Sequence, residues 1–466
     1  MTAAHAAMAT PLIRAGDLDA PLAWRDAAPI TRRQYLADVH ALAARLPAAG
    51  PMLNFTADRY RFAVGLGAAM LRGQGSLMPP NHTPDTVERL RTLFPSIYAL
   101  ADADAPALQL PTTHHAEVHA QVAATPVVPQ IDDHALAAQV LTSGSTGAPL
   151  PHPKHWGLLV RNTQAGAQRL ARQMGRRDLV GVTLVATVPA QHMYGFESTV
   201  LIALLGGAAF DTGRPFYPAD IAAALERAPR PRMLVTTPFH LKMLLDSNVP
   251  LPAIDLTVCA TAPLTPQLAA RAEAALAAPL MEIYGCTEAG QVASRRSTSG
   301  AEWQLYDGVE MSGDDDAVTV QGGHVPQPTV LADILEVIDA TTFRLLGRSN
   351  DLINIAGKRS SLGHLNFHLN SITGVQDGAF WLPPESADRS VDSVVRPIAF
   401  VVAAPGLVAS GVHETVLAAL RQRVDAAFLP RRIVAVEALP REAGTGKLQA
   451  LPFAAWAERA LASTKG

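Results

Sequence analysis

The stretch LTVCATAPLTPQLAARAEAAL, residues 256–276, joins a strand pattern directly to a helix pattern. Its apolar start predicts a buried strand, and Thr265 with Pro266 predicts the N-cap and first residue of an alanine-rich helix. MLVTTPFHLKMLLDS (233–247) repeats the scheme with a strand ending near Thr237, and VGVTLVATVP (180–189) predicts another buried strand. Strands that alternate with helices favour a mostly parallel sheet covered on both faces, with ligands beyond the carboxyl ends of its strands. We therefore expect an α/β fold whose ligand edge carries the loops after residues 141, 188, 258 and 283.

Two later segments predict additional units. SGDDDAVTVQGGHVPQPT (312–329) predicts a β subdomain that closes off the α/β body. After Ser349 or Asn350, the strand PIAFVV (397–402), a helix over 414–427 and the strand RIVAVE (432–437) predict a small α+β unit. We therefore expect a large domain at residues 1–349 and a small C-terminal domain at 350–466.

Composition excludes several classes of protein. The chain has 466 residues, 48% hydrophobic, and 38 basic against 41 acidic residues give a net charge of −3, which favours neither nucleic acid nor an anionic membrane. Its two cysteines, Cys259 and Cys286, have no CxxC spacing, so neither a disulfide framework nor a cysteine metal site is expected. Residues 1–17 lack a signal-peptide pattern, and the apolar run 200–210 is shorter than the roughly 20 residues that span a bilayer. We expect a cytoplasmic globular protein with no transmembrane segment.

A loop rich in glycine and hydroxyl residues follows the apolar stretch 135–141, in LTSGSTGAPLPHPKHWG (141–157). Its N–H groups and hydroxyls suit phosphate oxygens, and they come from Thr142, Ser143, Gly144, Ser145, Thr146 and Gly147. The loop is not a Walker P-loop, and GTGKL at 444–448 fails that pattern too because Leu448 replaces Ser or Thr. GLGAAM (65–70) lacks the third glycine of a dinucleotide fingerprint and indicates helix packing. Ordinary NTPase and dehydrogenase functions are therefore disfavoured.

Three other stretches carry isolated charged residues. MEIYGCTEAGQ (281–291) puts Tyr284 and Glu288 on a loop after a strand, where a carboxylate suits Mg²⁺ bridging phosphates; a helix cap formed by Glu288 explains the pattern equally well. Asp333 is an acid within the apolar stretch LADILEVID (331–339). It is either a carboxylate that binds a ribose or a strand residue that faces solvent. Lys447, in the glycine-rich LPREAGTGKLQ (439–449), is either a solvated lysine or a cation that a mobile loop brings onto a phosphate.

The order of these pieces is more specific than any one of them. TSGSTGAP, PAQHMYGF, ATAPL, YGCTE, LAD, GRSNDLINIAGKR and PREAGTGKL follow one another between residues 139 and 448, and together they resemble the adenylate-forming superfamily. That superfamily includes acyl-CoA and aryl-CoA synthetases, peptide-synthetase adenylation domains and beetle luciferases. The resemblance implies a large N-terminal domain and a small mobile C-terminal one. It also implies that a carboxylate attacks the α-phosphate of ATP to give acyl-AMP, whose acyl group then passes to a thiol.

The resemblance also implies roles for single residues. In the nucleotide site, 142–147 would grip the β- and γ-phosphates and Tyr284, beside Gly285, would stack on adenine. Thr287 and Glu288 would position the α-phosphate and magnesium. The remaining implied roles are ribose binding by Asp333 and Arg348, catalysis by Lys447, and a hinge at Asn350. A thiol route would pass Gly357 and Arg359.

The implied acyl pocket is lined by His192, Ala260, Thr261, Ala262 and Pro263. His192 also stands at a position with a catalytic role in the resemblance, although a packed loop histidine is the alternative. Three positions depart from the usual pattern. Leu150 replaces a lysine, with Lys154 four residues further on, and the stretches LAD and ATAP replace TGD and GGAP.

The short N-terminal region and the variant phosphate loop look most like a bacterial branch found with aryl-polyene and xanthomonadin-type pigment pathways. We therefore expect an acid–thiol ligase that uses ATP and Mg²⁺ to activate a small aromatic acid, such as a hydroxybenzoate. The acceptor would be the phosphopantetheine thiol of CoA or of an acyl carrier protein. The alternatives are a medium- or long-chain fatty acyl-CoA or acyl-carrier-protein synthetase and, from another class, a non-catalytic nucleotide-binding relative.

Overall fold

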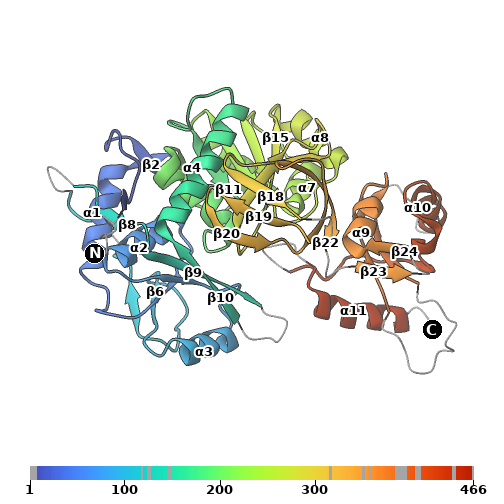
Figure 1. Ribbon diagram of the computed structural model, residues 1–466, viewed down its shortest axis with the longest axis horizontal. Coiled ribbons are helices and arrows are strands. Elements are labelled where there is room, and N and C mark those ends of the chain that lie inside the picture. The colour runs from blue at the N-terminus through green and yellow to red at the C-terminus, as the bar shows by residue number, and fades with distance from the viewer. Residues whose placement is uncertain are drawn as a thin grey trace.

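The protein has an α/β fold built on two large sheets (Figure 1). The computed structural model describes residues 8–116, 119–122, 127–143, 149–313, 317–348, 352–355, 358–383, 396–404, 411–442 and 448–463. An 11-stranded sheet has the order β21-β22-β17-β16-β15-β14-β13-β11-β12-β2-β3, and a 6-stranded sheet has the order β10-β9-β5-β4-β6-β7. The fold class expected from the sequence is confirmed.

The larger sheet is parallel in its centre and antiparallel at both ends. From β2 to β15 its neighbours pair parallel, whereas β3 and the strands from β16 to β21 pair antiparallel. The prediction of a mostly parallel sheet therefore holds for the centre alone. Its strands are β2 (Pro21–Arg25), β3 (Ala28–Thr31), β11 (Thr183–Ala186), β12 (Ala209–Asp211), β13 (Arg232–Thr236), β14 (Leu256–Cys259), β15 (Leu280–Cys286), β16 (Gly290–Arg295), β17 (Glu302–Leu305), β21 (Asp333–Val337) and β22 (Thr342–Arg348).

The smaller sheet lies in the N-terminal part of the chain. Its strands are β4 (Met52–Phe55), β5 (Ser76–Met78), β6 (Tyr98–Ala101), β7 (Thr112–His114), β9 (Leu136–Ser143) and β10 (Pro149–His155). Two minor strands, β1 (Ala9–Pro11) and β8 (Gln130–Asp132), pair with each other. The apolar stretch before the phosphate loop is thus strand β9, and β10 returns antiparallel beside it.

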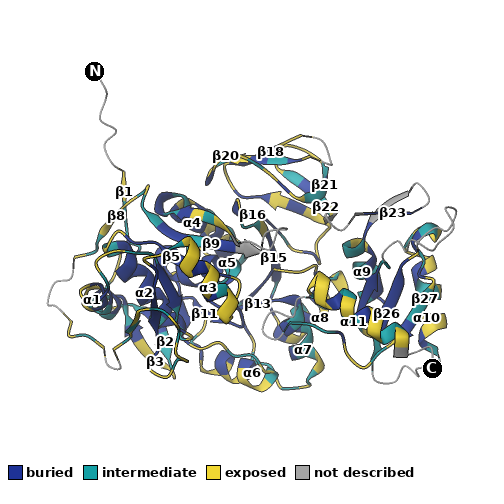
Figure 2. Cartoon of the chain, turned by 90° about the horizontal axis from the view of Figure 1, so that it is seen from below, coloured by how far each residue is buried: buried dark blue, intermediate teal, exposed yellow. Residues whose placement is uncertain are grey.

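Helices cover both faces of the central sheet, as predicted. Along β11, Leu184 packs into the core that contains α2 (Arg59–Leu71), α4 (Trp156–Gln173) and η1 (Phe196–Gly206). The next residue, Val185, packs into the core formed with α6 (Pro218–Arg227), α7 (Pro238–Asp246) and α8 (Pro266–Leu276). Figure 2 shows that β11 is buried, whereas the outer side of α6 is largely exposed. Helix α8 begins as expected, because the Thr265 side chain accepts a hydrogen bond from the Leu268 N–H.

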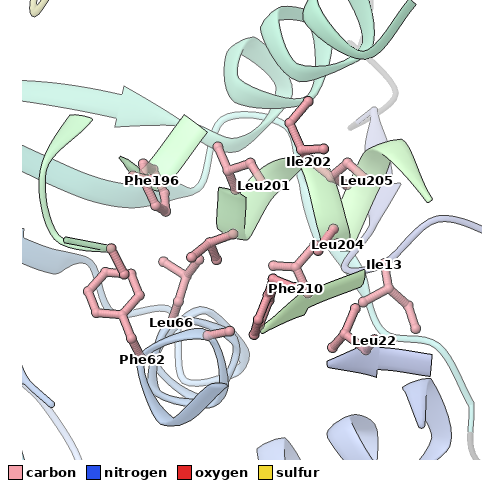
Figure 3. Close-up of a cluster of buried hydrophobic side chains, with 14 of the residues drawn as sticks. Ile13, Leu22, Phe62, Leu66, Phe196, Leu201, Ile202, Leu204, Leu205 and Phe210 are labelled. Carbon is pink, nitrogen blue, oxygen red and sulfur yellow. The ribbon is translucent and has the colours of Figure 1, made fainter. Parts of the chain in front are cut away.

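The apolar run at 200–210 lies inside the protein. It forms most of η1, a π-helix whose residues are all buried, and then β12. Its side chains pack against Phe62 and Leu66 of α2 and against Leu22 of β2 (Figure 3). Among the residues that the structure describes, no helix is both long and apolar enough to cross a bilayer.

Helix α2 packs tightly through its glycines. A Cβ at Gly65 would lie 2.5 Å from Leu100 Cδ2, and one at Gly67 would lie 2.6 Å from the Tyr35 hydroxyl. This agrees with the prediction that GLGAAM serves helix packing. Helix α1 (Arg32–Ala43) packs against α2, whereas α3 (Pro84–Leu93) packs against strands β4 and β5 of the smaller sheet.

The predicted β subdomain and C-terminal α+β unit are both present. The former is the sheet of β18 (Val309–Ser312), β19 (Thr319–Gly322) and β20 (Val325–Val330). The predicted helix over 414–427 is wrong in its bounds, because α10 (Val412–Arg421) ends earlier and a short 3-10 turn, Ala426–Phe428, follows. Other C-terminal elements are β23 (Leu352–Ile355), β24 (Lys358–Ser361), α9 (Leu362–Asn370), β25 (Val375–Trp381), β26 (Ile398–Ala403), β27 (Arg432–Ala435) and α11 (Ala450–Ser463).

A buried cation joins the two halves of the N-terminal fold. Arg59 of α2 is 2% exposed, and its guanidinium donates to the carbonyl oxygens of Ala186 (3.2 Å) and Val188 (3.0 Å) and to Thr199 Oγ1 (2.8 Å). Burial lowers the pKa of Arg59 to about 10, so it remains charged at neutral pH. The guanidinium therefore ties α2 to the carboxyl end of β11 and to η1.

Arg59→Met should lower the free energy of unfolding by about 2 to 5 kcal/mol, because two buried carbonyls and a hydroxyl lose their donor. Urea denaturation followed by tryptophan fluorescence would measure the change. Arg72→Met, an exposed position at the end of the same helix, is the matched control and should leave the urea midpoint unchanged. Equal midpoints for Arg59→Met and the unmodified protein would contradict this role of Arg59.

Candidate functional site

The turn between β15 and β16 carries two of the predicted site residues. Thr287 and Glu288 lie between these antiparallel strands, and the Glu288 side chain is 50% exposed. No helix starts here, so the helix-cap alternative for Glu288 is wrong. The prediction that Tyr284 lies on a loop after the strand is wrong, because Tyr284 and Gly285 belong to β15 itself. The antiparallel return of β16 therefore leaves Glu288 at the tip of a tight hairpin.

Three predicted nucleotide residues lie together at the curled end of the large sheet. The Tyr284 hydroxyl donates to Asp333 Oδ2 at 2.6 Å, and Asp333 is the cross-strand partner of Arg348. Three strands, β22, β17 and β16, lie between β15 and β21 in the sheet order, so this contact requires the sheet to curl back on itself. The Tyr284 ring is 7% exposed and packs against Trp303 and Phe343. Stacking of Tyr284 on adenine stays a prediction.

Lys154 lies beneath the Thr287–Glu288 turn. Its side chain is buried, and its ammonium donates to the carbonyl oxygens of Thr287 and Glu288, the latter at 3.1 Å. Burial lowers the pKa of Lys154, and Glu197, Cys286 and Glu288 oppose this effect through their charges. Lys154 thus contacts the backbone of the turn. Leu150, which stands where the resemblance implies a lysine, is 57% exposed.

A buried carboxyl group accompanies Lys154. Glu197, at the start of η1, accepts a hydrogen bond of 2.5 Å from Asn162 Nδ2. Burial raises the pKa of Glu197 to about 7, against the opposing influence of Lys154 and of hydrogen bonds from Gln291 and Asn162. Sequence analysis missed this residue, although an acid beside the longest apolar run is the same signal that identified Asp333.

A cavity of about 280 Å³ lies between this network and the β18–β20 sheet. Its polar lining includes Lys154, Glu197, Glu288 and His324, and the hairpin residue Gly290 forms part of its wall. A Cβ at Gly290 would lie 2.4 Å from Asn162 Nδ2, and the φ of this residue is +79°, so a glycine is required here. The hairpin can approach α4 and η1 only because this position lacks a side chain.

Two histidines and a thiol adjoin the turn. His152 Nε2 lies 3.8 Å from Glu288 Oε1. Burial lowers the pKa of His324 to about 4, which keeps its imidazole neutral. Burial raises the pKa of the Cys286 thiol to about 11. None of these three was identified as a site residue from the sequence.

The predicted acyl-pocket residues follow the carboxyl ends of β11 and β14. His192 precedes the short helix α5 (Met193–Gly195), and Ala260, Thr261, Ala262 and Pro263 follow β14. Thr261 has a φ of +81°, which is strained for a β-branched residue. The missed residue Tyr194 lies beside them, with its hydroxyl 3.0 Å from the Val258 carbonyl oxygen. The two segments thus converge at the carboxyl edge of the parallel strands.

Several predicted residues lie outside the described part of the chain. These are Gly144, Ser145, Thr146, Gly147, Asn350, Gly357 and Lys447. For four further residues the structure describes the backbone alone. Thr142 and Ser143 lie in β9, Arg348 lies in β22 and Arg359 lies in β24. The predicted phosphate loop begins at the end of β9 and ends at the start of β10. Lys154 of β10 contacts the turn that carries Glu288.

The side chains at this turn suit Mg²⁺. One carboxylate, from Glu288, and the neighbouring Thr287 hydroxyl are the oxygen ligands that such an ion accepts alongside substrate phosphates. Within the described ranges, no group of three or more His, Cys, Asp or Glu side chains is arranged to hold a metal by protein ligands alone. A partly exposed single carboxylate therefore fits an ion that arrives with a nucleotide.

Comparison with known proteins agrees with this arrangement. The chain is 32% identical over 235 residues to a 4-coumarate–CoA ligase of Rhodobacter capsulatus, covering 50% of this chain and 58% of that protein. It is 30% identical over 278 residues to the corresponding ligase of Halorhodospira halophila, covering 58% and 66%. The chain thus spans less than two thirds of either relative.

Among solved structures, the fold matches O-succinylbenzoate coenzyme A synthetase from Bacillus subtilis, in complex with ATP and magnesium, with a TM-score of 0.74. The match covers 93% of this chain and 96% of that one at 15% identity, so it shows a shared fold. The family described as AMP-binding enzyme matches residues 37–335, well over half of the chain. The chain belongs to the family of AMP-binding enzymes.

Proposed function

We propose that the protein is an acid–thiol ligase that activates a carboxylic acid with ATP and transfers it to a phosphopantetheine thiol. The observation that carries this proposal is the convergence of Glu288, Tyr284 and Asp333 at one end of the sheet, next to the strands that flank the phosphate loop. The two bacterial relatives named as 4-coumarate–CoA ligases support it.

In the first half-reaction, a carboxylate oxygen forms a bond to the α-phosphorus of ATP, and pyrophosphate leaves. In this proposal residues 142–147 hold the β- and γ-phosphates, and Asp333 with Arg348 holds the ribose. Tyr284 supports Asp333 through its hydrogen bond. Lys447 neutralises the charge that develops between carboxylate and α-phosphate. Mg²⁺, bound at Glu288, would supply charge neutralisation on the phosphates.

In the second half-reaction, a thiolate attacks the acyl carbon and AMP leaves. We propose that residues 350–466 form a mobile domain that turns about Asn350, and that the thiol enters past Gly357 and Arg359. His192 and residues 260–263 would line the acyl pocket. The proposed acid is aromatic, consistent with the names of the bacterial relatives, and the proposed acceptor is CoA or a carrier protein, as in the pigment-pathway branch.

ATP–pyrophosphate exchange with a panel of benzoates, cinnamates and C6 to C16 fatty acids tests the proposal. Exchange with aromatic acids supports it, and exchange with fatty acids alone would replace the aromatic substrate by an aliphatic one. ATP binding without exchange for any acid would favour a nucleotide-binding protein without catalysis. Mass-spectrometric loading assays with CoA and holo carrier proteins side by side would then identify the acceptor.

Lys447→Ala should leave ATP binding intact and lower the rate of acyl-AMP formation by about 10² to 10³, the usual effect of removing a charge-stabilising group. Isothermal titration with ATP and a single-turnover adenylation assay would measure the two quantities. Lys242→Ala, an exposed lysine paired with Asp246 on α7, is the control. An equal rate in Lys447→Ala and the control would remove Lys447 from the mechanism.

Glu288→Gln should raise the Mg²⁺ concentration required for half-maximal exchange and lower kcat/KM by about two orders of magnitude, because an anionic ligand becomes a neutral one. Magnesium titrations of the exchange rate would show this shift. Glu310→Gln, at an exposed position of β18, should behave like the unmodified protein. An unchanged magnesium dependence in Glu288→Gln would argue against a metal-binding role.

Gly357→Trp should impair thioester formation at least about tenfold more than adenylation, because the indole would fill the proposed thiol route. Separate assays of acyl-AMP formation and of acyl transfer to CoA would compare the half-reactions. Equal losses in both would contradict the assignment of Gly357 to that route.

A further inference from the structure

Lys154 occupies an unusual position for a lysine. It lies on β10 opposite Ala138 of β9, and its side chain runs inward to the β15–β16 turn, 133 residues away in sequence. Its side chain is 8% exposed. A buried ammonium is costly unless its hydrogen bonds and charge are satisfied, so a lysine held here needs specific partners.

Those partners come from the turn and from η1. The ammonium donates to the carbonyl oxygens of Thr287 and Glu288, and the carboxyl groups of Glu197 and Glu288 oppose its deprotonation. Glu197 is itself fixed by Asn162 from α4 and by Gln291 from β16. Lys154 of β10 thus interacts with the β15–β16 turn by hydrogen bonds and with Glu197 of η1 by charge.

The two carbonyls that Lys154 binds belong to the residues of the proposed magnesium and α-phosphate site. Their backbone determines where the Thr287 hydroxyl and the Glu288 carboxylate are presented. At the far end of the turn the hairpin comes so close to α4 that a Cβ at Gly290 would lie 2.4 Å from Asn162 Nδ2. Lys154 binds the two carbonyl oxygens at the start of the turn, and it is the only buried lysine or arginine among the described residues that line the cavity.

We propose that Lys154 is a positioning residue, which fixes the Thr287–Glu288 turn in the conformation that binds magnesium-bound ATP. This inference rests on the proposed function. Lys154 does not contact the nucleotide in this proposal and acts through the two carbonyls. Glu197 supports it, because the charged form of this carboxyl group favours the protonated ammonium of Lys154.

Hydrogen–deuterium exchange of the ligand-free protein tests the positioning directly. In Lys154→Met, amides in peptides covering residues 284–291 should exchange about tenfold faster, as expected for the loss of one charge-assisted hydrogen bond. Amides of β13 and β14 should keep their protection. Unchanged exchange at the turn, or faster exchange throughout the domain, would overturn the proposal.

Nucleotide binding and kinetics provide the second readout. Lys154→Met should raise the Kd and KM for magnesium-bound ATP about tenfold with a smaller effect on KM for the acid, and Lys154→Arg should recover part of the loss. Glu197→Gln keeps the size of the side chain and should give a weaker change of the same kind. Lys242→Met is the surface control. Wild-type ATP affinity in Lys154→Met would overturn the proposal.

The two proposals fail in different ways. If the unmodified protein exchanges pyrophosphate with no acid, the proposed ligase function is refuted. The amide exchange and the Kd for magnesium-bound ATP do not depend on turnover, so they still decide whether Lys154 positions the turn.

Discussion

Buried cations bound to backbone carbonyls hold the separate parts of this fold together. Arg59 binds carbonyls at and just after the end of β11, Arg32 those at the end of η1, and Arg232 those at the end of α6. Carbonyls at the ends of helices lack partners within the helix and carry partial negative charge. A long cationic side chain from a neighbouring element satisfies several of them at once. The chain therefore uses arginine and lysine as internal connectors, and Lys154 extends this pattern to the functional turn.

The candidate site depends on the same kind of long-range connection. The sheet curls far enough for Tyr284 to donate to Asp333, and β10 comes close enough for Lys154 to reach the β15–β16 turn. Each contact links strands that are distant in sequence. The site residues thus come from the parallel centre, from the antiparallel end of the large sheet and from the smaller sheet, and the packing between these parts decides the geometry of the site.

Much of the central fold was predictable because its signals are local. Thr265 and Pro266 mark the start of α8, and the apolar strands at 183–186, 232–236 and 256–259 are continuous enough to identify. The smaller sheet was missed because strands as short as Ser76–Met78 carry little periodicity. Motif order identified Glu288 and Asp333 as residues of one site, but their surroundings were not predictable. The partners of Lys154 and Glu197 depend on tertiary packing, which no short stretch of sequence encodes.

The Cys286 thiol, beside the functional turn, affects how this protein can be studied. Burial raises the pKa of this thiol to about 11, which disfavours the thiolate at neutral pH. Cys259 is fully buried, and burial raises the pKa of its thiol as well. Because the thiolate is the reactive form, we expect both native cysteines to react slowly with alkylating reagents. A single cysteine introduced at an exposed position can therefore carry a fluorescent or spin label without prior removal of either native thiol.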